Sequence, residues 1–548
     1  MAAEASPEPA ARCLRKPLGS PESRGSKARL VPRCCLVWLI ACALAVIALT
    51  AGCGKSPQTD EPGAITFLIE STPLSLDPRI GTDAWSEDLD GLLFDGLVDR
   101  DAQMNVVPDL AQTWETPDPQ TYVFHLRRGV KFHDGRSLTS ADVKFTIDSI
   151  LSRELASPKR GAFLRVKSVE APDDATVIVR LSEAYASFLL NVSRLAIGIV
   201  PKGSGDVAHH PVGTGPFRFV SMTPDEEIIL ERNPDYFGPQ PKLDRVRFRI
   251  VPDTITRALE LRKGTADIGG VNSMTQDMAV ALEKQPGIAV EDEPGTSIGY
   301  VAFNFDDPIL AKRDVRQALA YATDRDTIIR YLLRGKARPA SSLLPPNHWA
   351  YEPNVKQYPY DPDQAERLLD AAGFPRAANG VRFRLTLKTS TEESTRLLGE
   401  ALAEQWRRVG VDLTLRPLES ATLQSDIGRG SFQLYTLRWT GYTNDDPDIF
   451  DYVFSSKRMP PDGANRGHYR YPALDALIDQ QRIEMDHDKR KAILSEIQKM
   501  VAENEPYINL WYYDNVCVYR NRLVGITIPP GGDYDFLKTA SLTSALAH

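Results

Sequence analysis

The sequence has few cysteines for its length, six in 548 residues. Four of them lie before residue 53, which leaves Cys53 and Cys517 in the rest of the chain. Cys517 stands in the apolar run 516–519, so we expect a buried strand residue and not a nucleophile. A chain this long can stabilise its core without disulfides. A disulfide scaffold is therefore excluded as the basis of the fold.

Sequence signatures of metal and nucleotide sites are also lacking. There is no H-E-x-x-H and no C-x-x-C. The pair His209-His210 has no partner at helical spacing, and a solvated loop is the better interpretation. Gly54-Lys55-Ser56 lacks the earlier glycine of a P-loop, because Leu49 stands in that position. We therefore expect no metal site, no cofactor and no nucleotide hydrolysis.

One hydrolase-like motif is present, Gly295-Thr296-Ser297-Ile298-Gly299. A G-x-S-x-G elbow needs a strand before the serine and a helix after it. Here the following residues, 300–305, alternate like a strand. We interpret the motif as a chance match and keep a hydrolase only as an unfavoured alternative.

The charge balance is acidic. After residue 52 the chain has 58 basic and 70 acidic residues, a net charge of −12. Nucleic-acid binding relies on basic surface, so it is excluded as a function. The 42% apolar content of a chain this long is enough for two or three lobes.

The N-terminal region has the pattern of an export signal. A basic stretch up to Arg33 precedes an uncharged run from Cys34 to Ala51, which ends in small residues and a cysteine, Leu49-Thr50-Ala51-Gly52-Cys53. This end resembles a bacterial lipobox, although Thr50 stands where Leu is commonest. The resemblance implies cleavage before Cys53 and a lipid on its thiol, which would leave Cys517 alone. A transmembrane anchor is the alternative, and both place the remaining chain outside the cytoplasm. Residues 1–30 are Pro-, Ser- and Arg-rich, and one interpretation is a true start at Val31 or nearby.

Strand and helix patterns are mixed along the chain after residue 63. Alternation predicts strands at 122–126, 177–181 and 246–250. Residues 383–387, a helix at 397–409 and residues 411–415 predict a parallel β-α-β unit. Further helices are expected at 314–334, 363–372 and 488–503. The fold class is therefore α/β in more than one lobe.

One stretch has the composition of a binding site, residues 438–448. It follows an apolar run and holds two aromatic residues, a glycine and three carboxylates at an expected strand end. Aromatic rings form flat apolar walls and carboxylates bind cations such as an amino terminus. A surface loop with Asp446-Pro447 as a turn is the equal alternative.

Residues 110–145 carry the strongest family signal. They run from Leu110-Ala111-Gln112-Thr113-Trp114-Glu115 through the stretch 122–135, with His133-Asp134-Gly135 as a tight turn, to a helix capped at Thr139. The stretch resembles the signature of the family 5 extracellular solute-binding proteins, the peptide- and nickel-binding components of ABC importers. Segments 212–217, 231–237, 314–325, 360–374 and 474–478 resemble that family in the same order.

The resemblance implies a two-lobed periplasmic-binding-protein-like fold (type II, cluster C) with an extra inserted domain. It places an N-terminal extension and lipoprotein signal peptide at 1–52 and a tether at 53–63. Lobe 1 would comprise 64–94, 214–299 and the return and tail at 521–548. The inserted domain would be 95–213 and lobe 2 would be 300–520.

The resemblance also implies the function. A monomeric protein would capture a short peptide outside the cytoplasm and deliver it to permease subunits served by a separate ATPase, with no chemistry of its own. A nickel- or metal-chelate-binding member of the same family is the alternative. Ligand-binding residues would come from one loop: Trp439, Gly441, Tyr442, Asn444, Asp445 and Asp446. Peptide-binding members carry an Asp three residues after the Trp, where this chain has Tyr442, so we expect Asp445 or Asp446 to bind the ligand ammonium instead.

Overall fold

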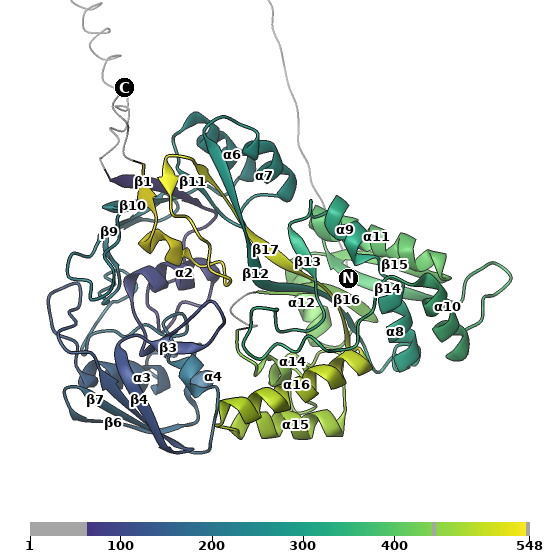
Figure 1. Cartoon of the computed structure of the whole chain (residues 1–548), viewed down its shortest axis with the longest axis horizontal. Coiled ribbons are helices and arrows are strands. Elements are labelled where there is room, and N and C mark those ends of the chain that lie inside the picture. Colours follow the sequence, from purple (N-terminus) through teal and green to yellow (C-terminus); the bar gives the residue numbers. More distant parts are fainter. Residues whose placement is uncertain (1–62, 441–444, 544–548) are drawn as a thin grey trace, which may run out of the picture. The chain divides into compact units, whose positions relative to one another are not determined.

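Two long antiparallel strands, β12 (Ile288–Phe303) and β17 (Tyr507–Arg520), lie at the centre of the main sheet. The computed structural model describes residues 63–440 and 445–543. Within them the sheet has eleven strands in the order β15-β14-β16-β12-β17-β11-β1-β10-β9-β8, with β13 paired to β17. The other bounds are β1 (Ala64–Ile69), β8 (Phe217–Thr223), β9 (Glu227–Arg232), β10 (Arg245–Ile250), β11 (Ile268–Val271), β13 (Ala337–Pro339), β14 (Phe383–Ser390), β15 (Val411–Leu418) and β16 (Leu434–Trp439). Figure 1 shows β12 and β17 passing from one group of these strands to the other.

The predicted β-α-β unit is confirmed at one end of this sheet. β14 and β15 pair in parallel, and α11 (Glu393–Arg408) connects them. The buried side of α11 includes Leu402 and Trp406, which pack with the inward-facing residues of β14. Gly410, with φ +83°, follows this helix and allows the sharp turn into β15. The local pattern therefore determines this end of the fold.

The prediction of one continuous helix at 314–334 is wrong. The structure has two helices there, α8 (Arg313–Tyr321) and α9 (Arg325–Tyr331). Asp324 begins the second helix by accepting a hydrogen bond from the backbone N–H of Thr327. A carboxylate in this role starts a helix, so the chain turns between the two segments.

Two other helix predictions are confirmed to within a residue or two. They are α10 (Pro362–Ala371), which Asp361 caps as expected, and α16 (His487–Asn504). The remaining helices near these strands are α12 (Ser420–Gly428), α14 (Ile449–Phe454) and α15 (Pro472–Ile483).

The opposite end of the main sheet combines segments that are far apart in sequence. β1 pairs in parallel with both β10 and β11. Residues 523–540 return to this end, where Leu523 and Phe536 share one apolar cluster with Phe67 and Phe248. The elements around it are α2 (Ala84–Leu93), α6 (Thr254–Lys263), α7 (Gln276–Glu283), the 3₁₀ helix η1 (Tyr534–Lys538), β18 (Leu523–Val524) and β19 (Ser541–Leu542). Cys517 lies in β17, fully buried in this cluster, as predicted.

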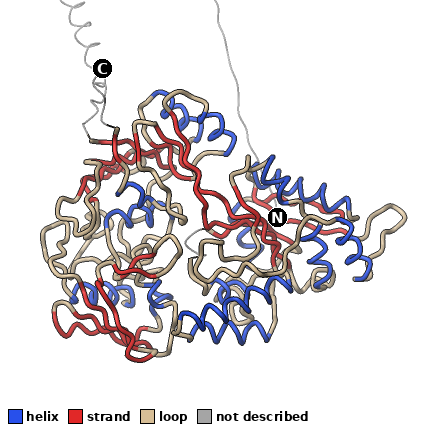
Figure 2. The backbone as a smooth tube through the Cα atoms, in the orientation of Figure 1, coloured by secondary structure: helices blue, strands red, loops and turns tan. Residues whose placement is uncertain are grey.

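A separate four-stranded antiparallel sheet has the order β4-β5-β7-β6. Its strands are β4 (Ala111–Asp118), β5 (Thr121–Leu126), β6 (Val166–Asp173) and β7 (Thr176–Leu181). The nearby elements are the hairpin β2 (Val98–Arg100) and β3 (Val106–Pro108), and the helices α3 (Ser140–Leu151), α4 (Arg160–Phe163) and α5 (Phe188–Asn191). Thr139 and Asp142 form a capping box at the start of α3, which confirms the predicted cap. Figure 2 shows this group of strands apart from the main sheet.

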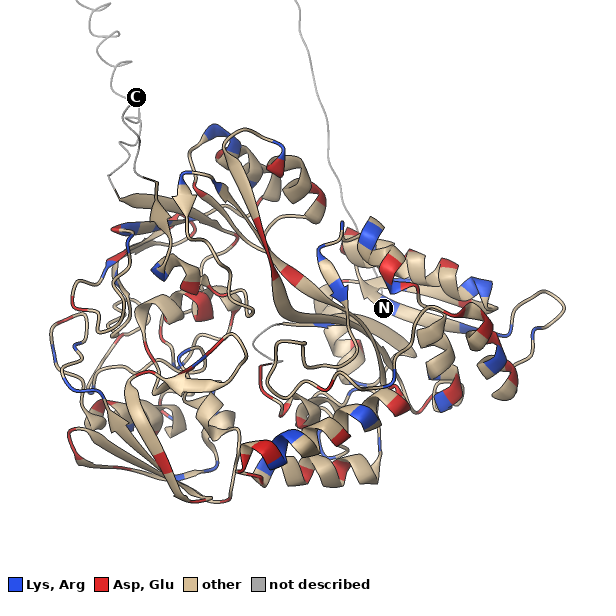
Figure 3. Ribbon diagram, in the orientation of Figure 1, with Lys and Arg blue, Asp and Glu red and all other residues tan. Residues whose placement is uncertain are grey.

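Charges of both signs alternate on the outer helices, as Figure 3 shows for α15 and α16. Acidic residues also mark the middle of β12 and β17. Two of them are paired with cations from β13 and the residue before it, Asp292 with Lys336 and Asp514 with Arg338. These pairs connect β13 to the two long strands at their centre.

Candidate functional site

The pairing of β12 with β17 is interrupted near its middle. The register shifts between Pro294 and Ile298 and again between Gly299 and Tyr300. A Cβ atom on Gly295 would lie 2.4 Å from the carbonyl oxygen of Tyr513, so only glycine fits there. A bulge of this kind bends a strand. Among the residues that the structure describes, β12 and β17 are the only strands that connect the two ends of the sheet.

The hydrolase-like motif lies in this bulge. Ser297 is in the middle of β12, and no helix follows it. Ser297 therefore lacks the strand-to-helix turn that a nucleophile elbow requires. Thr296 is fully buried, and its backbone N–H donates to the carbonyl oxygen of Pro530.

Asp445 lies where this bulge meets two other parts of the chain. Its Oδ2 is 2.6 Å from a guanidinium nitrogen of Arg100, and both side chains are at most 10% exposed. Its backbone carbonyl faces Nε2 of His348 at 3.2 Å. Burial raises the pKa of Asp445, while Arg100 and the hydroxyl of Thr296 oppose the rise. The other oxygen, Oδ1, is buried and has no hydrogen-bond partner among the described residues.

Asp446 has different partners. Its Oδ1 accepts hydrogen bonds from the hydroxyl of Ser187 at 2.7 Å and from the backbone N–H of Asp448 at 2.9 Å. Burial raises the pKa of Asp446 to about 6; Asp448 adds to the rise and Arg490 opposes it. Arg490 also donates to the Ser187 hydroxyl, at 2.7 Å. Asp446 is thus part of a polar network that joins α5 to α16.

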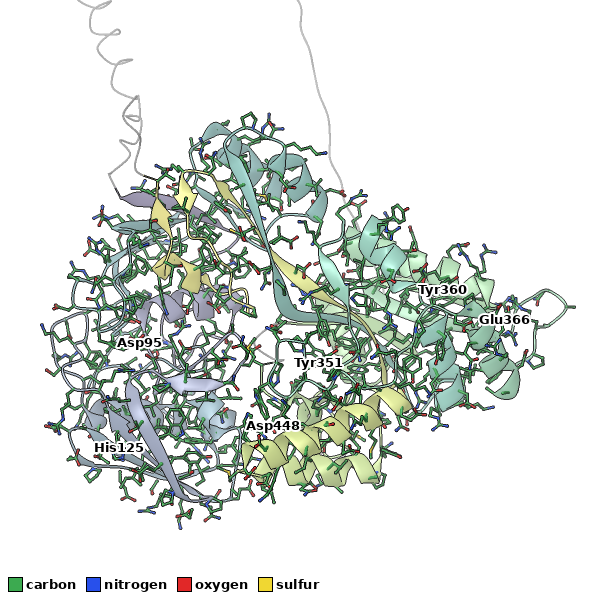
Figure 4. All side chains as sticks on the ribbon, in the orientation of Figure 1. Asp95, His125, Tyr351, Tyr360, Glu366 and Asp448 are labelled. Atoms are coloured by element: carbon green, nitrogen blue, oxygen red, sulfur yellow. The ribbon has the colours of Figure 1, made fainter. Side chains whose placement is uncertain are left out.

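Asp448 continues this network toward α15. Figure 4 labels it beside α15 and α16. It accepts from the side-chain amide of Gln481 at 2.7 Å and lies 3.3 Å from Arg482. Of the two carboxylates predicted to bind an ammonium, only Asp445 has an oxygen that is both buried and without a hydrogen-bond partner among the described residues.

Trp439 ends β16 next to this segment. Its ring stacks on Tyr300, with centroids 5.7 Å apart and planes 10° from parallel, and Tyr452 meets it edge-on. The residue is 9% exposed, so a ligand could contact only its edge. Gly441, Tyr442 and Asn444, which complete the predicted set, lie outside the described residues, as does Cys53.

Segments from the four-stranded-sheet region meet the second half of the chain around this site. The backbone N–H of Trp349 donates to Gln103, and the side-chain amide of Asn347 donates to Ala102. Farther along, the N–H of Ala186 donates to the carbonyl oxygen of Arg482. Residues 95–213 and residues 300–520 therefore contact each other on both sides of the Arg100–Asp445 pair.

Sequence reasoning missed two charged residues here, Arg100 and Glu87. Arg100 is the last residue of the short strand β2, with no motif around it, and its partner is 345 positions away. Glu87 lies on α2; burial raises its pKa to about 7, Lys159 and Arg100 oppose the rise, and Asp83 adds to it. No local sequence signal could have found either residue, because their environment comes entirely from tertiary contacts.

His133 and the pair His209-His210 lie in different environments. Nδ1 of His133 accepts from the N–H of Gly213 at 3.2 Å, and Nε2 lies 3.1 Å from the carbonyl oxygen of Gly215. Burial lowers the pKa of His133 to about 4, and the ring holds the segment leading into β8. His209 and His210 are exposed, as predicted. Within residues 63–440 and 445–543, no three His, Cys, Asp or Glu side chains form a group that could hold a metal ion.

No helix in the described part of the chain is long and apolar enough to cross a membrane.

Residues 105–461 match the model of the family described as bacterial extracellular solute-binding proteins, family 5. The chain is 27% identical over 529 residues to the dipeptide-binding protein of Escherichia coli K12, which covers 90% of this chain and 96% of that protein.

Two solved structures illustrate the likeness in fold. The periplasmic binding protein DppA from Helicobacter pylori, in complex with the peptide STSA, has a TM-score of 0.69 and 28% identity, covering 88% of this chain and 98% of that one. NikZ from Campylobacter jejuni, in complex with Ni(L-His), has a TM-score of 0.73 and 26% identity, covering 88% of this chain and all of that one.

Proposed function

Since the chain belongs to the bacterial extracellular solute-binding proteins of family 5, we propose that it binds short peptides outside the cytoplasm for an ABC importer. The peptides would pass to permease subunits served by a separate ATPase. The relatives support this proposal, because they include a dipeptide-binding protein and a binding protein solved with a peptide. The protein would act as a monomer and catalyse no reaction.

The observation that carries the peptide assignment is the carboxylate of Asp445. One oxygen is bound by Arg100, and the other is buried beside the bulge of β12 with no hydrogen-bond partner among residues 63–440 and 445–543. Buried acceptors in native proteins are nearly always satisfied. A peptide ammonium can donate to Oδ1, and it would add a second cation to a carboxylate that Arg100 alone balances. Trp439 would present the edge of its ring to the ligand.

The proposal also includes the lobes that the family resemblance implies. Lobe 1 would comprise 64–94, 214–299 and 521–548, the inserted domain 95–213, and lobe 2 residues 300–520. β12 crosses the boundary between residues 299 and 300, and β17 pairs with it on both sides of the bulge, so the bulge at 295–297 would be the hinge. The Arg100–Asp445 pair would then connect the inserted domain to lobe 2 in the closed form.

The proposal includes export and anchoring. Cleavage before Cys53 and lipid attachment to its thiol would tether the protein to a membrane through residues 53–63. Export is supported by the basic and apolar pattern before Cys53 and by the membership of the chain in a family of extracellular proteins.

An affinity selection tests the peptide proposal. The protein is immobilised, a tryptic digest of casein is passed over it, and retained peptides are identified by mass spectrometry. We expect retention of short peptides from the untreated digest and weak retention after N-acetylation. If nothing is retained from either digest, the peptide proposal is wrong.

The likeness to NikZ with bound Ni(L-His) favours a second candidate, a metal-chelate binder. Elemental analysis of protein purified without chelator separates the two. Stoichiometric nickel would replace the peptide proposal, whereas peptide retention without nickel would support it.

A further inference from the structure

The chain passes the bulge of β12 a second time after β17 has ended. Residues 529–535, which we call the strap, have the sequence Pro-Pro-Gly-Gly-Asp-Tyr-Asp; they follow β18 and include the first two residues of η1. The residues on either side of the strap, Ile528 and Phe536, are buried in the apolar cluster that includes Phe67 of β1. In Figure 1 this last, yellow part of the chain returns beside α2. The strap is therefore fixed to one end of the main sheet.

The strap supplies a hydrogen bond that the bulge takes away from β17. No residue between Pro294 and Ile298 is paired with β17. The backbone N–H of Thr296, which is fully buried, donates instead to the carbonyl oxygen of Pro530 at 3.1 Å. Buried backbone donors in native proteins are nearly always paired. Proline suits the accepting position, because its ring fixes φ and leaves no N–H of its own to be paired.

Asn515 of β17 holds the strap from the other side. Its side-chain nitrogen donates to the carbonyl oxygens of Pro529 and Pro530, at 3.0 and 2.9 Å, and its side-chain oxygen accepts from the amide of Asn272 at 2.9 Å. Asn515 is 2% exposed. Gly532 has φ +85°, and a Cβ atom there would lie 3.1 Å from the Asn515 oxygen, so the strap needs glycine to come this close. These bonds lie beside the bulge that we propose as the hinge.

The other end of the strap reaches Arg100 through one buried cation. Oδ2 of Asp535 lies 2.6 Å from the guanidinium of Arg194, whose side chain is 3% exposed. Arg194 also pairs with Asp99 at 3.0 Å, and Asp99 accepts from the backbone N–H of Arg100 at 2.9 Å. The strap therefore helps to fix the end of β2 from which Arg100 extends toward lobe 2.

Thr296 connects the strap to Asp445, the partner of Arg100. Burial raises the pKa of Asp445, and the hydroxyl of Thr296 is one of the two groups that oppose the rise, so this hydroxyl lies beside the carboxylate. The same residue is held by the strap through its backbone N–H. One short segment thus contacts the proposed hinge and supports both members of the Arg100–Asp445 pair.

We propose that the strap sets the balance between the open and closed forms of the protein. Its contacts with Thr296 and Asn515 would hold the bulge in the bend that places Asp445 opposite Arg100. Its contact with Arg194 would hold Arg100 in place for the same pair. Weakening either end of the strap would then favour the open form, although neither Asn515 nor Asp535 is proposed to touch ligand. The inference rests on the proposed function, because closure serves to retain the solute.

Distances between two spin labels measure the open and closed forms directly. The labels are attached through a non-canonical amino acid, so that the cysteines stay unchanged, at Lys167 on β6 and Asp363 on α10. Both positions are exposed, one in the proposed inserted domain and one in proposed lobe 2. Double electron–electron resonance gives the distance distribution of the whole protein with and without a peptide that the affinity selection retains.

Two variants weaken the strap at its two ends. Asn515→Asp keeps the size of the side chain and an acceptor for Asn272, but it replaces the donor that faces two carbonyl oxygens. Asp535→Asn removes the charge that faces Arg194. We expect both variants to shift the ligand-free distribution toward longer distances. We also expect them to raise the Kd of the peptide about two- to tenfold, because fewer molecules are in the form that retains it.

Asn521→Asp is the matched control. It makes the same chemical change at an exposed position just after β17, and it should keep the distances and the Kd of the wild type. Chemical denaturation measures the free energy of unfolding of each variant. If one strap variant does not fold, the variant at the other end still decides.

The outcomes separate this inference from the function on which it rests. A wild-type distance distribution in the strap variants would overturn it. A lower free energy of unfolding with unchanged distances would also overturn it, because the strap would then only stabilise the fold. If no peptide is retained at all, the proposed function fails, whereas the ligand-free distances still decide whether the strap controls opening.

Discussion

Replacing Asp445 with Asn should weaken peptide binding far more than replacing Asp446 with Asn. Asp445→Asn removes the negative charge that lies 2.6 Å from the Arg100 guanidinium, and both of these side chains are nearly buried. Because Arg100 and Asp445 belong to the proposed inserted domain and lobe 2, the loss reduces the free energy of closure and therefore the apparent affinity.

The structure sets the expected size of each effect. A hydrogen bond to a charged group contributes about 1.5–3 kcal/mol, and each 1.4 kcal/mol changes affinity tenfold, so Asp445→Asn should raise the Kd by about 10- to 150-fold. Asp446→Asn keeps an amide oxygen that can accept from both Ser187 and the N–H of Asp448. Its cost should stay below about 1 kcal/mol, which is about fivefold in Kd.

Calorimetric titration of a retained peptide measures both effects, and Arg100→Met completes a double-mutant cycle with Asp445→Asn. Since the two side chains act as a pair, the double variant should bind no worse than the weaker single variant. Simple addition of the two losses would refute the pairing, and so would a larger loss in Asp446→Asn than in Asp445→Asn.

Three further outcomes follow. Burial lowers the pKa of His348 to about 4 from an ordinary 6.5, so between these values the unfolded chain binds a proton that the folded chain does not. Because of His348, the free energy of unfolding should fall by about 2 kcal/mol between pH 7 and pH 5. In chemical denaturation, His348→Gln should lessen that fall, whereas His209→Gln, at an exposed position, should not. Cys53→Ser should move the protein out of the detergent phase in a partition assay and leave peptide binding intact; identical partition of both proteins would contradict lipid attachment. Ser297→Ala should leave peptide affinity unchanged, and an esterase activity that disappears in this variant would restore the hydrolase alternative.

The parts of the fold that local patterns determine were predictable from the sequence. The alternation of β14 and β15 and the apolar stripe of α11 specify a parallel unit without help from distant residues. Thr139 and Asp361 are caps that the sequence displays directly. The break at Asp324 shows the limit of this reasoning, because the apolar periodicity continues through a residue that starts a new helix.

The candidate site was predictable only in part. The loop after β16 was found from its composition, but its most informative contact joins Asp445 to a residue 345 positions away. The rings of Tyr300, Trp439 and Tyr507 likewise come together from three different strands, and none of them stands out in its own segment. Such groups arise from strand pairing and packing, which one sequence does not encode locally.

The identity of the bound solute shows most directly whether the protein binds short peptides. Native mass spectrometry of protein purified without denaturation from its native host measures any retained ligand, and fragmentation of the released species identifies it. We expect a non-covalent addition that fragments into amino-acid residues and carries a free amino terminus and a carboxylate. A retained species with no amino-acid residues, or nickel in stoichiometric amount, would contradict it.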